Sequence, residues 1–164
     1  DESGCNTDMT RRYAYSLGGS RAVDSAPLSK PKNTTILSSI QLDGTLRYTT
    51  FSGGTTVERF KRYLETDLLP HLNGNSVLIM DNMKSHHAKA VRNLLDSSGI
   101  RYIYLPPYSP DLNPIEKLWS KVKSFLRKFK ARTLDALPNA IQNAFHSVTV
   151  SDCSGWFRFC EYAL

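Results

Sequence analysis

The chain has 164 residues, with 21 Lys and Arg against 15 Asp and Glu and a formal net charge of +6. That length suits one domain with its own core and leaves little room for a second. A basic balance fits a polyanionic partner such as nucleic acid, although many basic domains are merely soluble. No apolar run approaches the roughly 20 residues of a membrane span, and the N-terminus lacks a signal-peptide pattern.

The three cysteines, Cys5, Cys153 and Cys160, are odd in number and lack the spacing of metal ligands. They therefore predict neither a disulfide framework nor a zinc site, and a reducing cell interior is the simpler interpretation of where the protein is found. The chain opens with "DESGCN" and no initiator methionine, which we interpret as a fragment of a longer protein.

The first part of the chain predicts a loop followed by a hairpin. Residues 1–30 are rich in Gly, Ser, Arg and Pro without a sustained period, so we expect a surface loop with at most a short extended piece over 11–16. Two β-rich runs, 34–42 and 45–51, then flank Asp43-Gly44. Asp-Gly between such runs is a strong hairpin signal.

The middle of the chain predicts a parallel crossover. Residues 55–69 carry apolar side chains at helical spacing, and the apolar run "SVLIM" (76–80) predicts a strand buried on both faces. A helix over 86–97, closed by Gly99, then leads to a strand over 100–105. Strand, helix and strand together form one right-handed unit.

The last part of the chain predicts helices over 114–129 and 133–147, and the aromatic tail over 156–163 fits one more. The full order is hairpin, helix, strand, helix, strand, loop, helix, helix. This order predicts an α/β fold with a mixed sheet.

Two carboxylates stand where such folds place their sites. Asp81 directly follows the "SVLIM" strand, and sites gather at the carboxyl ends of strands. Glu116 ends the stiff stretch "YSPDLNPIE", a sequence that also fits a plain helix start with Asn113 as N-cap, Pro114 at N1 and Glu116 completing a capping box. Hard divalent cations need rigidly held oxygen ligands, so the stiffness has a functional interpretation too.

"DES", "MDNMKSHH" and "LPPYSPDLNPIEKLW" resemble the DDE transposases of the mariner superfamily, in particular its bacterial insertion-sequence branch. The resemblance runs over essentially the whole chain. It implies that residues 1–164 are an RNase H-like catalytic domain with a mixed sheet in the order 3-2-1-4-5, flanked by helices. The first strand is expected ahead of Asp1 and so largely missing, as are upstream helix-turn-helix modules. A chain without that strand is expected to fold poorly.

The resemblance also implies chemistry. Asp1, Asp81 and Glu116 correspond to the family's three catalytic acids and would bind two Mg²⁺ or Mn²⁺ ions. Such a centre cuts transposon ends and joins them to target DNA by in-line phosphoryl transfer. The implied partners are the terminal inverted repeats, target DNA and a second copy in a homodimer, and the implied location is the bacterial cytoplasm, at the nucleoid.

Further residues are expected around these acids. Asn82 would orient Asp81 or a bound water, and Asn113 would lie beside them. His86 is expected near the scissile phosphate, the alternative being that His86 and His87 form a polar pair in the first turn of a helix.

The helix over 114–129 is amphipathic. Trp119 lies on its apolar stripe and is expected in the core. Lys117, Lys121 and Lys128 face the other way, so they are either DNA-backbone contacts or a solvated face.

Two rival functions remain open. A catalytically silent, domesticated or decayed transposase fragment would keep the fold and the basic surface as a DNA-binding scaffold, and the missing first strand favours it while the three retained acids oppose it. A glycosidase-like pair of carboxylates is less supported because no aromatic-lined cleft is evident. The chain contains no P-loop or dinucleotide fingerprint.

Overall fold

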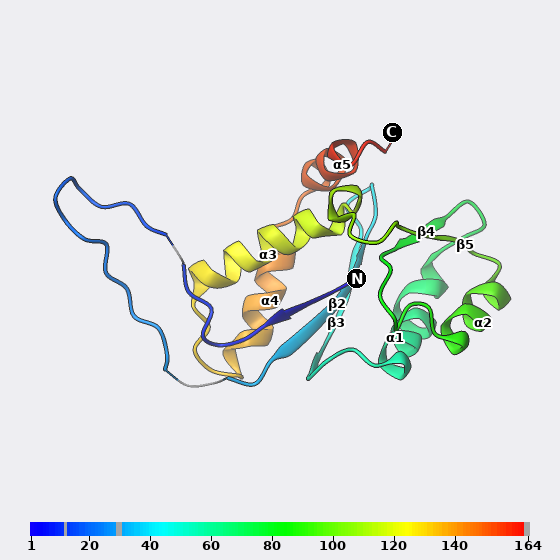
Figure 1. Ribbon diagram of the computed structural model, residues 1–164, viewed down its shortest axis with the longest axis horizontal. Helices are drawn as coiled ribbons and strands as arrows, with labels where there is room; N and C mark the ends of the chain where they lie inside the picture. Colours follow the sequence, from blue (N-terminus) through cyan, green and yellow to red (C-terminus); the bar gives the residue numbers. More distant parts are fainter. Residues whose placement is uncertain (12, 29–30, 163–164) are drawn as a thin grey trace.

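A computed structural model describes residues 1–11, 13–28 and 31–162 (Figure 1). The elements follow the chain as β1 (Glu2–Cys5), β2 (Thr34–Ile40), β3 (Leu46–Ser52), α1 (Val57–Tyr63), η1 (Leu64–Leu68), η2 (Leu69–His71), β4 (Val77–Met80), α2 (Lys89–Ser98), β5 (Arg101–Tyr104), η3 (Pro110–Leu112), α3 (Ile115–Phe129), α4 (Ala136–His146) and α5 (Val150–Phe159).

Strands β1, β2 and β3 form an antiparallel sheet in that order. The hairpin predicted around Asp43-Gly44 is confirmed, since β2 and β3 pair from Ile40 opposite Leu46. Strand β1 pairs with β2, and the backbone of Asp1 extends the ladder by two hydrogen bonds to Ser38, of 2.9 and 3.1 Å. The expected loop is therefore wrong at residues 2–5, and the first strand does not lie wholly ahead of Asp1.

Strands β4 and β5 form a separate parallel pair joined by α2, as the predicted crossover requires. Gly99 ends α2 in the left-handed conformation, with φ +70°. Strand β4 is not buried on both faces, because Val77 is 44% exposed.

The predicted order 3-2-1-4-5 is present as two pieces, 3-2-1 and 4-5. Within the described ranges no ladder joins β1 to β4. A cavity of about 120 Å³ lies there instead, bordered by residues 38–41 of the β2 end and 77–80 of β4.

Alternation along β2 separates two apolar cores. Ile36 packs in a core with α3 and α4, whereas Leu37 packs in a second core with α1, α2 and Met80. Successive side chains of a strand point to opposite faces. The antiparallel sheet is thus covered by α3 and α4 on one side and by α1 on the other (Figure 1).

The helix starts differ from expectation at two places. Helix α2 begins at Lys89, so His86 lies in the turn before it and not in its first turn. Helix α3 begins after Pro114 without any side-chain cap, so the predicted Asn113–Glu116 capping box is wrong. There the Glu116 N–H donates to the backbone carbonyl of Asn113, because the preceding turn of η3 already satisfies the helix entry.

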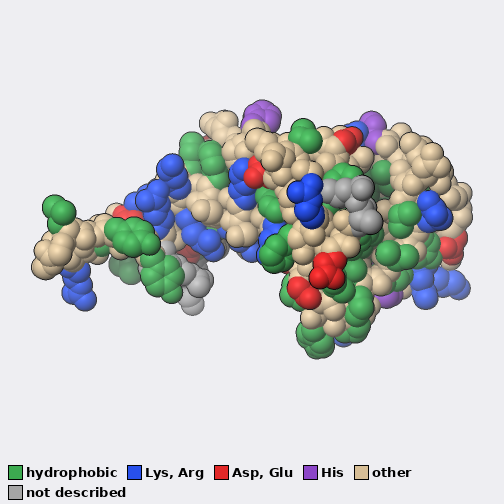
Figure 2. Space-filling model, turned by 90° about the horizontal axis from the view of Figure 1, so that it is seen from above, with side chains coloured by type: hydrophobic (Ala, Val, Ile, Leu, Met, Phe, Trp, Pro, Cys, Tyr) green, Lys and Arg blue, Asp and Glu red, His purple; other side chains and the backbone are tan. Residues whose placement is uncertain are grey.

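Between β1 and β2, residues 13–28 lie in an arm that projects from the domain (Figures 1 and 2), whereas Met9 still packs against the core with α3 and α4. The described residues between the two strands contain no helix or strand, as predicted for this region; Arg12, inside the expected extended piece, lies outside the described residues. Lys130 fastens the arm to the end of α3 through Asp24, at 2.6 and 2.7 Å.

All three cysteines are buried, and none is paired with another in this structure. In the described part of the chain, no helix has both the length and the apolar character needed to cross a membrane.

The hairpin turn offers a test of the fold. Gly44 has φ +88°, and a Cβ there would lie 2.9 Å from the Val150 side chain at the start of α5. We expect Gly44→Ala to lower the free energy of unfolding by about 1–3 kcal/mol, because the new methyl meets both strain and a neighbour. Gly18→Ala is the control, since nothing lies within 4 Å of that position. Urea unfolding of both variants checks this, and equal midpoints would contradict it.

Candidate active site

Asp1 is held by the helix that packs across the sheet. Its Oδ1 accepts the Glu2 N–H at 2.7 Å, and its Oδ2 accepts the indole N–H of Trp119 at 3.1 Å. Trp119 is buried in the core, as predicted. Its hydrogen bond to Asp1 was not predicted from the sequence. The same side chain therefore packs α3 and orients a candidate metal ligand.

Asp81 follows β4, as its sequence position predicts. Its Oδ1 accepts the Met83 N–H at 3.1 Å and lies 2.6 Å from Nδ1 of His86. The contact with Met83 is the turn-capping alternative, so capping and a place in the site coexist. Burial raises the pKa of Asp81, but His86 and the Met83 N–H outweigh it and leave the pKa below its ordinary value.

His86 is fully buried, which neither sequence interpretation anticipates. Its ring centroid lies 4.1 Å from that of Phe60, and Nε2 lies 3.6 Å from Oε2 of Glu2. Burial lowers the pKa of His86, but the carboxylates of Asp81 and Glu2 raise it by more, so the pKa is raised overall. The polar pair in a helix turn is wrong for His86.

His87 has different neighbours from His86. Its ring stacks on Tyr104 with centroids 4.0 Å apart, and its Nε2 contacts the side-chain oxygen of Asn82. Asn82 therefore pairs with His87 in this structure and not with Asp81.

Glu116 lies in the first turn of α3 with its side chain exposed. A hollow walled by residues 105–110 is lined by Asp81, Asn82, Asn113 and Glu116. The cavity between the sheets is lined by Asp1, Asp81 and Asn113. Asp81 and Asn113 thus stand between the two spaces, with Asp1 on one side and Glu116 on the other.

The donors at this edge are carboxylate and amide oxygens, which fit a hard divalent cation such as Mg²⁺ or Mn²⁺. Among the described residues, however, no three His, Cys, Asp or Glu side chains come close enough together to hold a metal ion. The acids border one region without forming a finished metal cage, so metal binding by Asp1, Asp81 and Glu116 stays a prediction.

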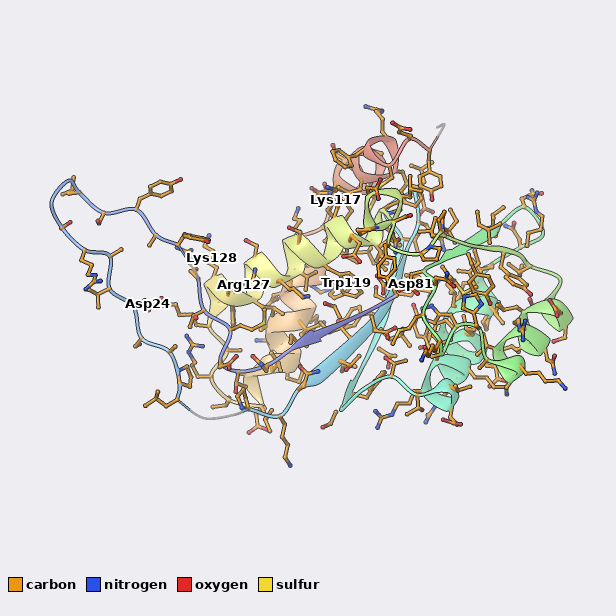
Figure 3. All side chains as sticks on the ribbon, in the orientation of Figure 1. Asp24, Asp81, Lys117, Trp119, Arg127 and Lys128 are labelled. Atoms are coloured by element: carbon orange, nitrogen blue, oxygen red, sulfur yellow. The ribbon has the colours of Figure 1, made fainter. Side chains whose placement is uncertain are left out.

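Two of the three predicted DNA-contacting lysines are engaged with α5. Lys117 Nζ lies 3.8 Å from the ring centroid of Phe159, and Lys121 Nζ lies 2.5 Å from Asp152. Lys128 lines an open groove along α3. Figure 3 shows Trp119 and Asp81 near one end of α3 and Lys128 near the other.

Sequence reasoning missed Glu2. It is the residue after Asp1, its side chain is only 13% exposed, and both its carboxylate oxygens are buried without a hydrogen-bond partner. A glutamate in a stretch predicted as loop gives no signal of burial; only a strand prediction over 2–5 could have found it.

An α/β domain with one aspartate just before a strand, a second just after another strand and a glutamate at a helix start matches a known class of enzymes. The sequence profile described as "DDE superfamily endonuclease" matches residues 1–138, so the chain belongs to this family.

The chain is 29% identical over 97 residues to the transposable element Tc1 transposase of Caenorhabditis elegans, covering 57% of this chain and 36% of that protein. The Mos1 transposase paired-end complex with the left transposon end superposes with a TM-score of 0.80 at 20% identity, covering 96% of this chain and 50% of Mos1. The Mos1 mariner paired end complex with Mn gives 0.78 at 21% identity, covering 98% and 50%.

The profile match confirms the predicted DDE family, and the superposition on Mos1 supports the mixed α/β, RNase H-like fold. The chain spans about a third of the Tc1 transposase and half of Mos1. The bacterial insertion-sequence branch stays a prediction.

The contact between Asp81 and His86 predicts how the stability of the metal-free protein depends on pH. The raised His86 pKa gives stability that is complete below the unfolded value of about 6.5 and is lost as pH rises through the folded pKa. The lowered Asp81 pKa gives stability that is present above about 3.9 and is lost as pH falls through the folded pKa.

We therefore expect the contribution of this pair to the free energy of unfolding to be largest between about pH 4 and 6.5. Urea unfolding at a series of pH values, compared with His86→Asn, isolates it. Parallel pH profiles for the two proteins would contradict the assignment.

Proposed function

We propose that this domain cuts transposon DNA ends and joins them to target DNA by divalent-metal-dependent, in-line phosphoryl transfer. One observation carries the proposal: Asp1, Asp81 and Glu116 border the same edge of a chain that belongs to the DDE superfamily endonucleases. The Mos1 complexes with a transposon end and with Mn support the choice of substrate and metal.

Asp1, Asp81 and Glu116 would hold the metal, as two Mg²⁺ or Mn²⁺ ions. When bound, such ions supply the charge that activates an attacking oxygen and stabilises the leaving one. The chain's own part is positioning. The Trp119 indole orients Asp1, and the Met83 N–H with His86 orients Asp81.

Glu116 is the acid whose position depends most on backbone stiffness. The short turn of η3 and Pro114 fix the start of α3, and no side-chain hydrogen bond caps that helix. Its exposed carboxylate faces the hollow that it shares with Asp81, where a phosphate backbone could enter.

DNA would run along α3. Lys128 lines the open groove and is proposed to contact the phosphate backbone as it stands. Lys117 and Lys121 would first have to leave Phe159 and Asp152, so we propose that their contribution depends on movement of α5. The target strand is proposed to bind at the same acidic edge.

From the string "SPDLNPIE" we propose that the protein belongs to the bacterial insertion-sequence branch. The proposed location is the cytoplasm, at the nucleoid. Terminal inverted repeats in the flanking genomic DNA would support this, and a eukaryotic source would overturn it.

A homodimer is proposed through the arm. The arm projects away from the body of the domain (Figure 2), and the described part of the chain does not cover its apolar side chains. The exposed ones are Tyr13, Tyr15, Leu17, Val23 and Leu28. Exposed apolar segments of this kind mark interaction sites, and the Mos1 structure is a paired-end complex. The occupant we propose is a second copy of this chain.

Replacing Tyr13 and Tyr15 with serine should shift the protein from dimer to monomer, because two large apolar contacts are lost. Light scattering coupled to gel filtration, with transposon-end DNA present and absent, measures this. Leu134→Ser is the control, an exposed apolar residue outside the arm. A double variant that stays dimeric under both conditions would refute the role of the arm.

Asp81→Asn or Glu116→Gln should abolish nicking of supercoiled plasmid and remove the thermal stabilisation given by Mn²⁺, because each deletes one oxygen ligand's charge. Asp111→Asn, an exposed carboxylate in η3, is the control and should keep both properties. If the parent protein binds DNA but neither binds metal nor nicks, the silent scaffold is the correct function.

A further inference from the structure

Glu2 is a buried carboxylate that faces the imidazole of His86. Cys5 packs in the core that contains α3, so the alternation of β1 turns Glu2, three residues earlier, to the opposite face, where His86 and Phe60 lie. Both Glu2 oxygens are buried without a hydrogen-bond partner. Burying a carboxylate is costly unless it is paired, and the ion-pair partner that the described residues provide for Glu2 is His86.

His86 is fixed from several sides. Its ring packs against Phe60, and its backbone carbonyl accepts the hydroxyl of Tyr104 at 2.8 Å. The two ring nitrogens face different carboxylates: Nε2 lies 3.6 Å from Glu2, and Nδ1 lies 2.6 Å from Asp81. The imidazole thus spans the space between β1 and the end of β4, where the two sheets share no ladder in the described part of the chain.

Asp81 has two different oxygens as a result. Oδ1 takes both the Met83 N–H and the His86 contact. No hydrogen bond to Oδ2 occurs within residues 1–11, 13–28 and 31–162, and Asp81 lines the hollow that contains Glu116. Fixing Oδ1 therefore determines how the carboxylate is presented to that hollow.

We propose that Glu2 is a positioning residue: it holds the His86 ring at Nε2, and through that ring it fixes the orientation in which Asp81 meets a divalent cation. The inference rests on the proposed function in one respect, that Asp81 is a metal ligand. Groups that orient a metal ligand in this way usually change metal affinity by about 10–100-fold when they are removed.

The main experiment measures Mn²⁺ affinity by calorimetry on the full chain. Glu2→Gln keeps the size of the side chain and removes its charge, and we expect the Kd for Mn²⁺ to rise by about tenfold. Glu65→Gln is the matched control, the same change at an exposed position paired with Lys61, and should leave the Kd unchanged. A Glu2→Gln protein with the parent's Kd would overturn the proposal.

His86→Asn separates the two contacts of the ring. Asparagine carries an amide nitrogen near the position of Nδ1, so it can still reach Asp81, but it has no group at Nε2. We expect the same tenfold loss as for Glu2→Gln, and no further loss in the double variant, because both changes break one connection. Losses that add in the double variant would show that Glu2 does not act through His86. If Glu2→Gln does not fold, parent-like affinity in His86→Asn overturns the proposal by itself.

Two other results would show that the proposed function, and not the role of Glu2, is wrong. If the parent binds no Mn²⁺, or Asp81→Asn binds it equally well, Asp81 is not a metal ligand. The role of Glu2 is then decided by the imidazole ¹⁵N and ¹H resonances of His86 in the metal-free protein. Glu2→Gln must shift them and Glu65→Gln must not; unshifted resonances in Glu2→Gln would refute the positioning role.

Discussion

The arrangement of the site depends on how two sheets are joined without a shared backbone ladder. The antiparallel sheet carries Asp1 and the parallel pair carries Asp81, and in the described ranges no strand of one pairs with a strand of the other. Side chains join them instead: the apolar core in which Leu37 meets Phe60 and Met80, and the buried His86 between carboxylates of both sheets. Apolar packing sets the distance between the sheets but has no preferred direction, so the polar contacts must fix the orientation.

The three acids are consequently held in unequal ways. Asp1 accepts hydrogen bonds from an indole and a backbone N–H, whereas Asp81 accepts one from a backbone N–H and lies against the imidazole of His86. Glu116 is exposed and has only the rigidity of its own helix start. The two aspartates therefore have defined orientations in the free protein, whereas the glutamate keeps rotamer freedom that it would lose on binding a cation.

The sequence predicted best where local chemistry decides the outcome. Asp43-Gly44 defines a hairpin, Gly99 ends a helix, and the stripe containing Trp119 packs as expected. Strand β1 could not be found, because "ESGC" is four residues long and contains a glycine and a glutamate that propensity assigns to loops. These residues form a strand because they pair with β2, which lies about 30 residues later in the sequence.

The same difference between local and long-range causes applies to the residues of the site. Asp81 and Glu116 were predicted from their positions at a strand end and a helix start, and both line one hollow. The burial of His86 could not be predicted, since a histidine pair before a helix is equally compatible with solvent; its burial follows from Phe60 and Glu2, which are distant in sequence. The missing cap at Asn113 arises because η3 completes the turn with backbone bonds alone.

The arm between β1 and β2 has a consequence for how this chain can vary. Closing a flexible loop costs entropy that grows only with the logarithm of its length, so doubling or halving residues 6–33 would change the stability of the β1–β2 pairing by only about 0.6 kcal/mol. The arm is tied to the domain at two places, because Arg132 donates to the backbone carbonyls of Thr7 and Met9 and Lys130 pairs with Asp24. Insertions and deletions should therefore accumulate in the arm at little thermodynamic cost, and its length in this protein is free to match whatever surface it has to reach.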